Sequence, residues 1–162
     1  MTYEDFVDIF QNAVTVYNSG IVAPTPPLNF HYDYVWYNNA EAGNKYPSML
    51  FECSPTFEFN GLQSNGNPGL QTFNGKLFFY DTYWEGEKLS DAVGNTVESW
   101  RKVSRLNDLA IILMGNINVL MRNAGARDIN WGKGFVAKDV HNPRLVQVTI
   151  DFTATLKVDC KV

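Results

Sequence analysis

The stretch Leu145–Cys160, LVQVTIDFTATLKVDC, alternates polar and apolar side chains and decides how the end of the chain folds. Successive side chains of a β-strand point to opposite faces, so one face of this strand is apolar and the other almost wholly polar. Sixteen residues at ~3.3 Å each would extend roughly 50 Å, well beyond the usual strand of about five or six residues. We expect the excess length to need a partner, which favours assembly over an isolated enzyme.

The composition is that of one globular domain, residues 1–162. Hydrophobic residues make up 45% of the chain and aromatic residues 14%, which is enough to build a core and excludes global disorder. The net charge is −4, and the only tight basic cluster is Arg101, Lys102 and Arg105. Nucleic-acid-binding proteins usually carry a basic stripe, so tight nucleic-acid binding is not expected.

The sequence also predicts the compartment in which the chain folds. Cys53 and Cys160 are too few for a disulfide framework. The first residues, MTYEDFVDIF, lack the basic and apolar segments of a signal peptide. No run approaches the roughly eighteen consecutive apolar residues of a membrane-spanning helix. We therefore expect folding in a reducing cytoplasm, without a membrane span.

Two segments carry apolar residues at helical spacing. The first begins near Thr2, a candidate cap with Asp5, and ends at Asn18-Ser19-Gly20. The second runs to Gly125, and Thr96 is its possible cap. Its apolar surface is broader than one stripe, which predicts contacts beyond its own sheet. The apolar positions are Tyr3, Phe6, Val7, Phe10, Ala13, Val14 and Tyr17 in the first helix, and Leu106, Leu109, Ala110, Leu113, Ile117, Leu120, Met121 and Ala124 in the second.

Alternating segments predict the strands, which we expect at 28–38, 48–60, 76–84, 127–138 and 145–160. Ser54-Pro55 interrupts the second of them, because proline lacks the N–H of a sheet ladder. The last two form a hairpin through His141-Asn142-Pro143. Antiparallel strands with two helices predict an α+β fold, an antiparallel sheet of about five or six strands with an N-terminal helix and a second long helix packed on one face.

A long loop is predicted at Asn60–Gly75, NGLQSNGNPGLQTFNG, because it is dense in glycine and asparagine. Compact domains rarely carry loops of this length unless the loop has a function or is ordered by a partner. We expect it to contact a neighbouring subunit, and a simple surface loop is the alternative. The candidate contact residues are Gly61, Asn65, Gly66, Pro68, Gly69 and Phe73.

No motif predicts catalysis, a cofactor or a metal. His31 and Asp33 share a strand face, but two ligands do not make a metal site. The two cysteines are expected to pack as small apolar residues. Gly132-Lys133-Gly134 lacks the spacing of a phosphate-binding loop. The carboxylates on or beside strands fall where solvent is expected, so we predict that the protein is not an enzyme; these carboxylates are Glu52, Glu58, Asp81 and Glu85.

The order of elements resembles the tail-terminator and neck-ring proteins of tailed bacteriophages, over residues 2–20, 76–125 and 144–161. The resemblance is one of architecture, and the segments 24–27 and 30–36 have no counterpart in it. It implies a structural virion subunit, assembled in the host cytoplasm, that forms a homo-oligomeric ring with other neck, portal or tail proteins. Tail-tube subunits belong to the same class.

The resemblance also implies that DNA passes through the ring without tight binding. The polar row of the last strand is then the candidate lumen face, namely Gln147, Thr149, Asp151, Thr153 and Thr155. The alternative is a small-ligand-binding or hydrolytic α+β domain whose pocket is lined by Phe30, Tyr32, Tyr34 and Trp36. Adhesion of a virion protein to the host surface is a third hypothesis.

Overall fold

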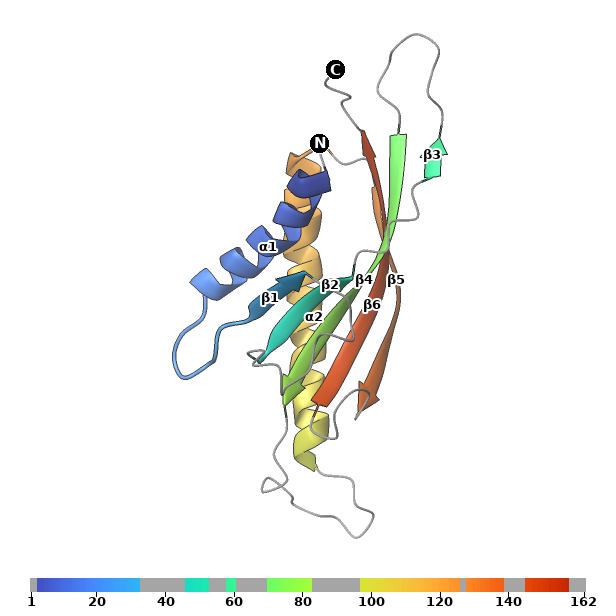
Figure 1. Ribbon diagram of the computed structural model, residues 1–162. Coiled ribbons are helices and arrows are strands. Elements are labelled where there is room, and N and C mark those ends of the chain that lie inside the picture. Colours follow the sequence, from blue (N-terminus) through green and yellow to red (C-terminus); the bar gives the residue numbers. More distant parts are fainter. Residues whose placement is uncertain are drawn as a thin grey trace.

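The computed structural model describes residues 3–32, 46–52, 58–60, 70–82, 97–125, 128–138 and 145–157 (Figure 1). Two helices lie on one face of a mixed, mostly antiparallel sheet. The predicted α+β class is therefore confirmed. In chain order the elements are α1 (Tyr3–Ser19), β1 (Asn29–Tyr32), β2 (Ser48–Glu52), β3 (Glu58–Asn60), β4 (Leu70–Thr82), α2 (Val97–Asn123), β5 (Asp128–Lys138) and β6 (Leu145–Lys157).

Both helices form where the apolar spacing predicts them. At the end of α1, the Gly20 N–H donates to the Tyr17 carbonyl at 3.1 Å. Beyond the end of α2, Gly125 has a φ of 78°, the left-handed conformation that glycine adopts at helix ends. Thr2 and Thr96, the predicted caps, lie outside the described residues. No helix within the described ranges is long and apolar enough to cross a membrane.

The strands lie in the order β1-β2-β4-β6-β5, and β3 also pairs with β4. All neighbouring pairs are antiparallel except β1 and β2, which are parallel. Glu52 of β2 pairs with Lys76 of β4, and Glu58 of β3 pairs with Thr72 of β4. Between these two pairs the β2–β3 side contains two residues more than the β4 side. The predicted interruption at Ser54-Pro55 falls between Glu52 and Glu58, at residues that lie outside the described part of the chain. Residues 33–38 of the first predicted strand also lie outside it.

The length of β6 is matched inside the chain. It pairs with β4 along its whole length, from Leu145↔Thr82 to Lys157↔Leu70. On its other side it pairs with β5. The expectation that this strand needs an external partner is therefore wrong for residues 145–157, because two long strands of the same chain satisfy its backbone hydrogen bonds. Residues 158–160 lie outside the described part.

The predicted loop is shorter than expected, because residues 70–75 belong to β4. Phe73, expected at a subunit contact, is instead a core residue that stacks on Phe6 at a ring-centroid distance of 4.9 Å. Glycine is required at position 75, where a Cβ would lie 2.5 Å from Cζ of Phe152. The remaining predicted contact residues, which lie outside the described ranges, are Gly61, Asn65, Gly66, Pro68 and Gly69.

The main core lies between the helices and the sheet. Its centre is aromatic: Phe10 lies 4.5 Å from Phe51 and 5.2 Å from Phe152 between ring centroids. Helix α2 contributes the aliphatic side of this core through Leu106, Ala110, Leu113, Ile117 and Met121. Burial of these side chains holds both helices on one face of the sheet. Among the described residues no helix covers the opposite face, here called the outer face (Figure 1).

Candidate functional site on the outer face of the sheet

The outer face is built by alternate residues of β2, β4 and β6, because their neighbours along each strand point into the helix-covered core. Along β6 the apolar row lies in that core, from Val146 to Ala154. The polar row, Gln147 to Thr155, therefore lies on the outer face. The predicted separation of the two rows is correct, but the outer face itself has two unlike halves.

One half of the outer face is buried. Leu50, Phe78, Tyr80 and Leu145 form a second hydrophobic cluster, against which Tyr46 packs. Two residues of the polar row are enclosed with this cluster: Gln147 is 3% exposed and Thr149 is 0% exposed. A lumen face is exposed along its whole length, so the prediction of a lumen face is wrong for these two residues. Their direct cross-strand neighbours are Tyr80 and Phe78, large side chains next to which a smaller polar group is readily covered.

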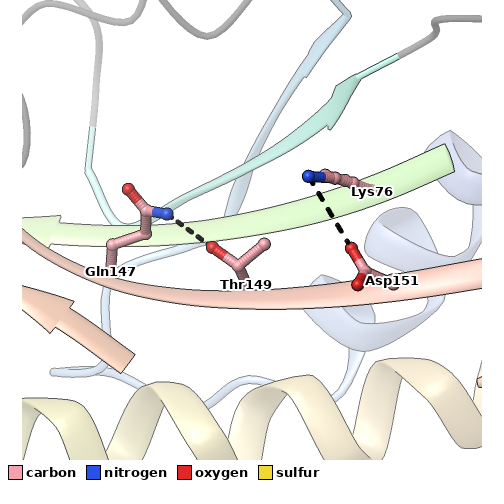
Figure 2. A network of polar contacts seen from close by, with 4 residues as sticks. All are labelled: Lys76, Gln147, Thr149 and Asp151. Carbon is pink, nitrogen blue, oxygen red and sulfur yellow. Dashed lines mark hydrogen bonds and ion pairs between the residues drawn. The ribbon is translucent and has the colours of Figure 1, made fainter. Parts of the chain in front are cut away.

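The buried half contains polar atoms whose hydrogen-bonding capacity is incompletely used. The Gln147 amide donates to the Thr149 hydroxyl, as Figure 2 shows. The oxygen Oε1 of Gln147 and Oγ of Ser48 are buried and have no hydrogen-bond partner in the described structure. Buried polar groups without partners lower stability, so these two oxygens are local weak points of the fold.

The other half of the outer face is a polar ladder across β4 and β6, made of three directly opposite pairs. The Thr72 and Thr155 hydroxyls lie 3.4 Å apart. The Thr153 hydroxyl donates to Asn74 Oδ1 at 2.7 Å. The third pair is the ion pair Lys76–Asp151, with 4.0 Å between Nζ and Oδ1 and about half of each side chain exposed (Figure 2). Asp151, Thr153 and Thr155 are therefore the members of the predicted lumen face that solvent reaches.

A shallow hollow of about 490 Å³ opens beside this ladder. Register places Glu52, Lys76 and Asp151 in one row across β2, β4 and β6, so one ammonium lies between two carboxylates. Such a row can hydrogen-bond and form ion pairs, and exposed pairs of this kind contribute little to stability. The hollow is lined by Glu52, Asn74, Gly75, Lys76, Asp151, Phe152 and Thr153.

Phe30 and Tyr32, the described members of the aromatic row predicted to line a pocket, do not line this hollow. Phe30 packs against the main core, and Tyr32 stacks on Phe51 at 5.8 Å between ring centroids. Both therefore belong to the helix-covered face. Burial raises the pKa of the Tyr32 phenol. Tyr34 and Trp36 lie outside the described residues, as does Asp33, the predicted companion of His31. Within the described ranges no group of three or more histidines, cysteines or carboxylates could hold a metal ion.

The strand predicted at 127–138 is β5, and it ends the strand order of the described sheet, with apolar side chains exposed that the sequence pattern did not predict. Phe135 and Val136 are adjacent in this strand and are 50% and 45% exposed. Phe135 lies beside Thr149 on the outer face, and Val136 lies beside Val148 on the helix side. The adjacent apolar pair was the available signal, because an edge strand lacks a neighbour to cover its side chains. The register shift between Trp131 and Gly134 interrupts the first half of β5.

Comparison with known proteins adds no family to this description. No protein-family model matches the chain, and no curated protein matches it.

Proposed function

We propose that the protein is a structural subunit of a ring in the neck or tail of a tailed bacteriophage, of the tail-terminator or connector type. The ring joins head to tail and lets DNA pass. The observation that carries the proposal is the edge strand β5, eleven residues long, with apolar side chains exposed on both of its faces. In the described part of the chain its far side pairs with no strand.

An open strand edge presents unpaired backbone donors and acceptors, which a strand of another chain can satisfy. Natural edges are often protected by bulges and lysines, and the first half of β5 has both the register shift and the exposed Lys133. The second half, residues 134–138, pairs with β6 in regular register and exposes Phe135 and Val136, and Lys138 lies at its end. We therefore expect the subunit contact at residues 134–138. Contacts of unlike surfaces close into a ring where the rotation between subunits permits it.

The polar ladder suits the wall of a DNA passage. Its charged members are Lys76 and Asp151, which oppose one another, and its other members are neutral. A surface without net positive charge makes few phosphate contacts, so DNA can slide along it. The other partners of the ring would be neighbouring neck, portal or tail proteins.

The edge contact is tested by replacing both Phe135 and Val136 with lysine and measuring the assembly state by native mass spectrometry of concentrated protein. We expect rings of the wild-type protein and no rings of the double variant, because charges at a strand edge oppose pairing. The matched control is Val16→Lys on α1, where the side chain is 52% exposed and far from β5 in sequence. Rings of unchanged stability in the double variant would show that β5 is not the contact.

A second function, small-ligand binding, is favoured by the hollow beside the ladder. Its row of two carboxylates and one ammonium fits a small polar, charged ligand, whereas a pocket lined by aromatic side chains would suit an apolar or sugar-like one. A ligand that binds the folded state raises the melting temperature by mass action. Thermal shift screening of small amines and amino acids, with Lys76→Met and Asp151→Asn as controls, tests this function.

A further inference from the structure

Helix α2 exposes a continuous stripe on the side turned away from its buried residues. Residues three and four apart lie on one face of a helix. The stripe consists of Ser104, Asp108, Ile111, Gly115, Val119 and Arg122, all of which are exposed. Ile111 is 60% exposed and Val119 57%, and Ile112, at the margin of the stripe, is 51% exposed. Exposed apolar residues gathered on one helix face and flanked by charged ones form a candidate interaction surface.

Gly115, at the centre of the stripe, has no function within the chain that would require glycine. A Cβ at this position would meet no atom within 4 Å, and its φ is not positive. Glycine in the interior of a helix is unfavourable relative to alanine. What it offers is the close approach of a second backbone to this point of the helix.

The stripe is complementary to itself about Gly115. When two copies of α2 pack antiparallel around a two-fold axis at this residue, position 115−n faces position 115+n of the other copy. Ile111 then faces Val119 of the other copy, four residues on either side of the axis. Asp108 faces Arg122, seven residues on either side. Each contact occurs twice, as in any two-fold interface.

The charges of this arrangement are available for pairing. Among the described residues neither Asp108 nor Arg122 takes part in an ion pair. Arg122 lies in the last turn of α2, where a cation is favourable, so its position costs the helix nothing. A parallel arrangement would instead place Asp108 against Asp108 and Arg122 against Arg122, which is repulsive.

We propose that two copies of this chain associate through α2, antiparallel and two-fold about Gly115, with Ile111 and Val119 as the apolar contacts and Asp108 and Arg122 as the charged ones. The interface is independent of the proposed ring contact, because it uses the helix layer and leaves β5 free. Before assembly, the same contact would join two free copies of the chain. After assembly, it would join two rings.

Charge reversal tests the proposal by sedimentation equilibrium. Asp108→Lys or Arg122→Glu alone should weaken dimerisation roughly tenfold or more, since each change places like charges opposite one another twice. The double variant, Asp108→Lys with Arg122→Glu, should restore it, because the exchanged charges again face opposite ones. The control Asp8→Lys makes the same change on the exposed side of α1 and should have no effect. Circular dichroism checks that every variant is folded.

A second measurement reports the axis directly. Gly115→Cys should form a disulfide between the two copies at position 115 under mild oxidation, since such a bond needs Cα atoms within roughly 7 Å. Peptide mapping separates it from any bond of Cys53 or Cys160. A wild-type chain that stays monomeric up to about 1 mM, or a double reversal that does not restore dimers, would overturn the proposal. If the β5 variants lose their rings but keep their dimers, this would support an α2 interface that is independent of the ring contact.

Discussion

Single glycine residues determine how closely other groups can approach the strands and helices of this protein. At Gly75 a Cβ would overlap the Phe152 ring, so any side chain there forces the ring to shift. At Gly115 the space is open. From sequence alone both glycines appear as interruptions of a regular pattern, because the packing that distinguishes them comes from residues far away in the chain.

Gly75→Ala should lower the free energy of unfolding by about 1–3 kcal/mol, because the added methyl group overlaps the Phe152 ring. Gly115→Ala is the matched control and should raise the free energy of unfolding by about 0.5–1 kcal/mol, since alanine is the better helix former and meets no atom. Urea titration of monomeric protein measures both. An increase in both variants would mean that Phe152 does not cover Gly75.

Ser48→Ala should raise the free energy of unfolding by about 1 kcal/mol, because it removes a buried hydroxyl that has no hydrogen-bond partner. Thr153→Ala is the comparison: its hydroxyl donates to Asn74, so its loss should be neutral or slightly destabilising. The same urea titrations apply. A clear loss of stability in Ser48→Ala would show that the hydroxyl is bonded in solution.

For the helices and strands, the period of the apolar residues was the reliable signal of secondary structure. The 3.6-residue spacing predicted both helices, and the two-residue alternation predicted β6 with its apolar row against the core. The start of β4 was missed because 70–75 has the composition of a loop, and only pairing with β6 makes it a strand. The parallel pairing of β1 with β2 depends on the path of the chain between them, which alternation does not encode.

The outer face of β6 also showed what alternation omits. The alternation correctly assigns Gln147 and Asp151 to one face of β6, but it carries no information on which residues cover that face. Phe78 and Tyr80 of β4 lie opposite the polar residues of one half, and Asn74 and Lys76 opposite those of the other. Burial of Gln147 and Thr149 is therefore a property of the strand pair, which the sequence of β6 alone could not predict.

A lysine in the buried half of β6 should lower the stability of the fold much more than a lysine in the exposed half. Thr149→Lys should cost at least about 3 kcal/mol of unfolding free energy, because the ammonium enters a fully buried site without an opposite charge. Thr153→Lys, on the exposed ladder, should change it by only about 0.5 kcal/mol. Denaturant midpoints measure both. If Thr149→Lys were as stable as wild type, the buried half would be open in solution.

The whole molecule combines an open strand edge at β5 with the polar ladder on the outer face of the sheet. If the ladder lines a DNA passage, Thr153→Lys particles should assemble yet eject DNA slowly, because every subunit adds a phosphate contact. Higher salt should restore the rate, since such contacts weaken with ionic strength. The control is Asp8→Lys on α1, which adds the same side chain away from the ladder. Ejection at the wild-type rate in Thr153→Lys particles would remove the ladder from the passage and leave the ring itself standing.

Electron cryomicroscopy of the purified phage particle tests the proposed ring most directly, because it would show this chain in any ring that it forms there. We expect that the chain can be traced in a ring between head and tail, with residues 134–138 of β5 against a neighbouring copy and Thr153 facing the channel. Density for this chain with β5 open to solvent, or particles that lack the chain altogether, would contradict it.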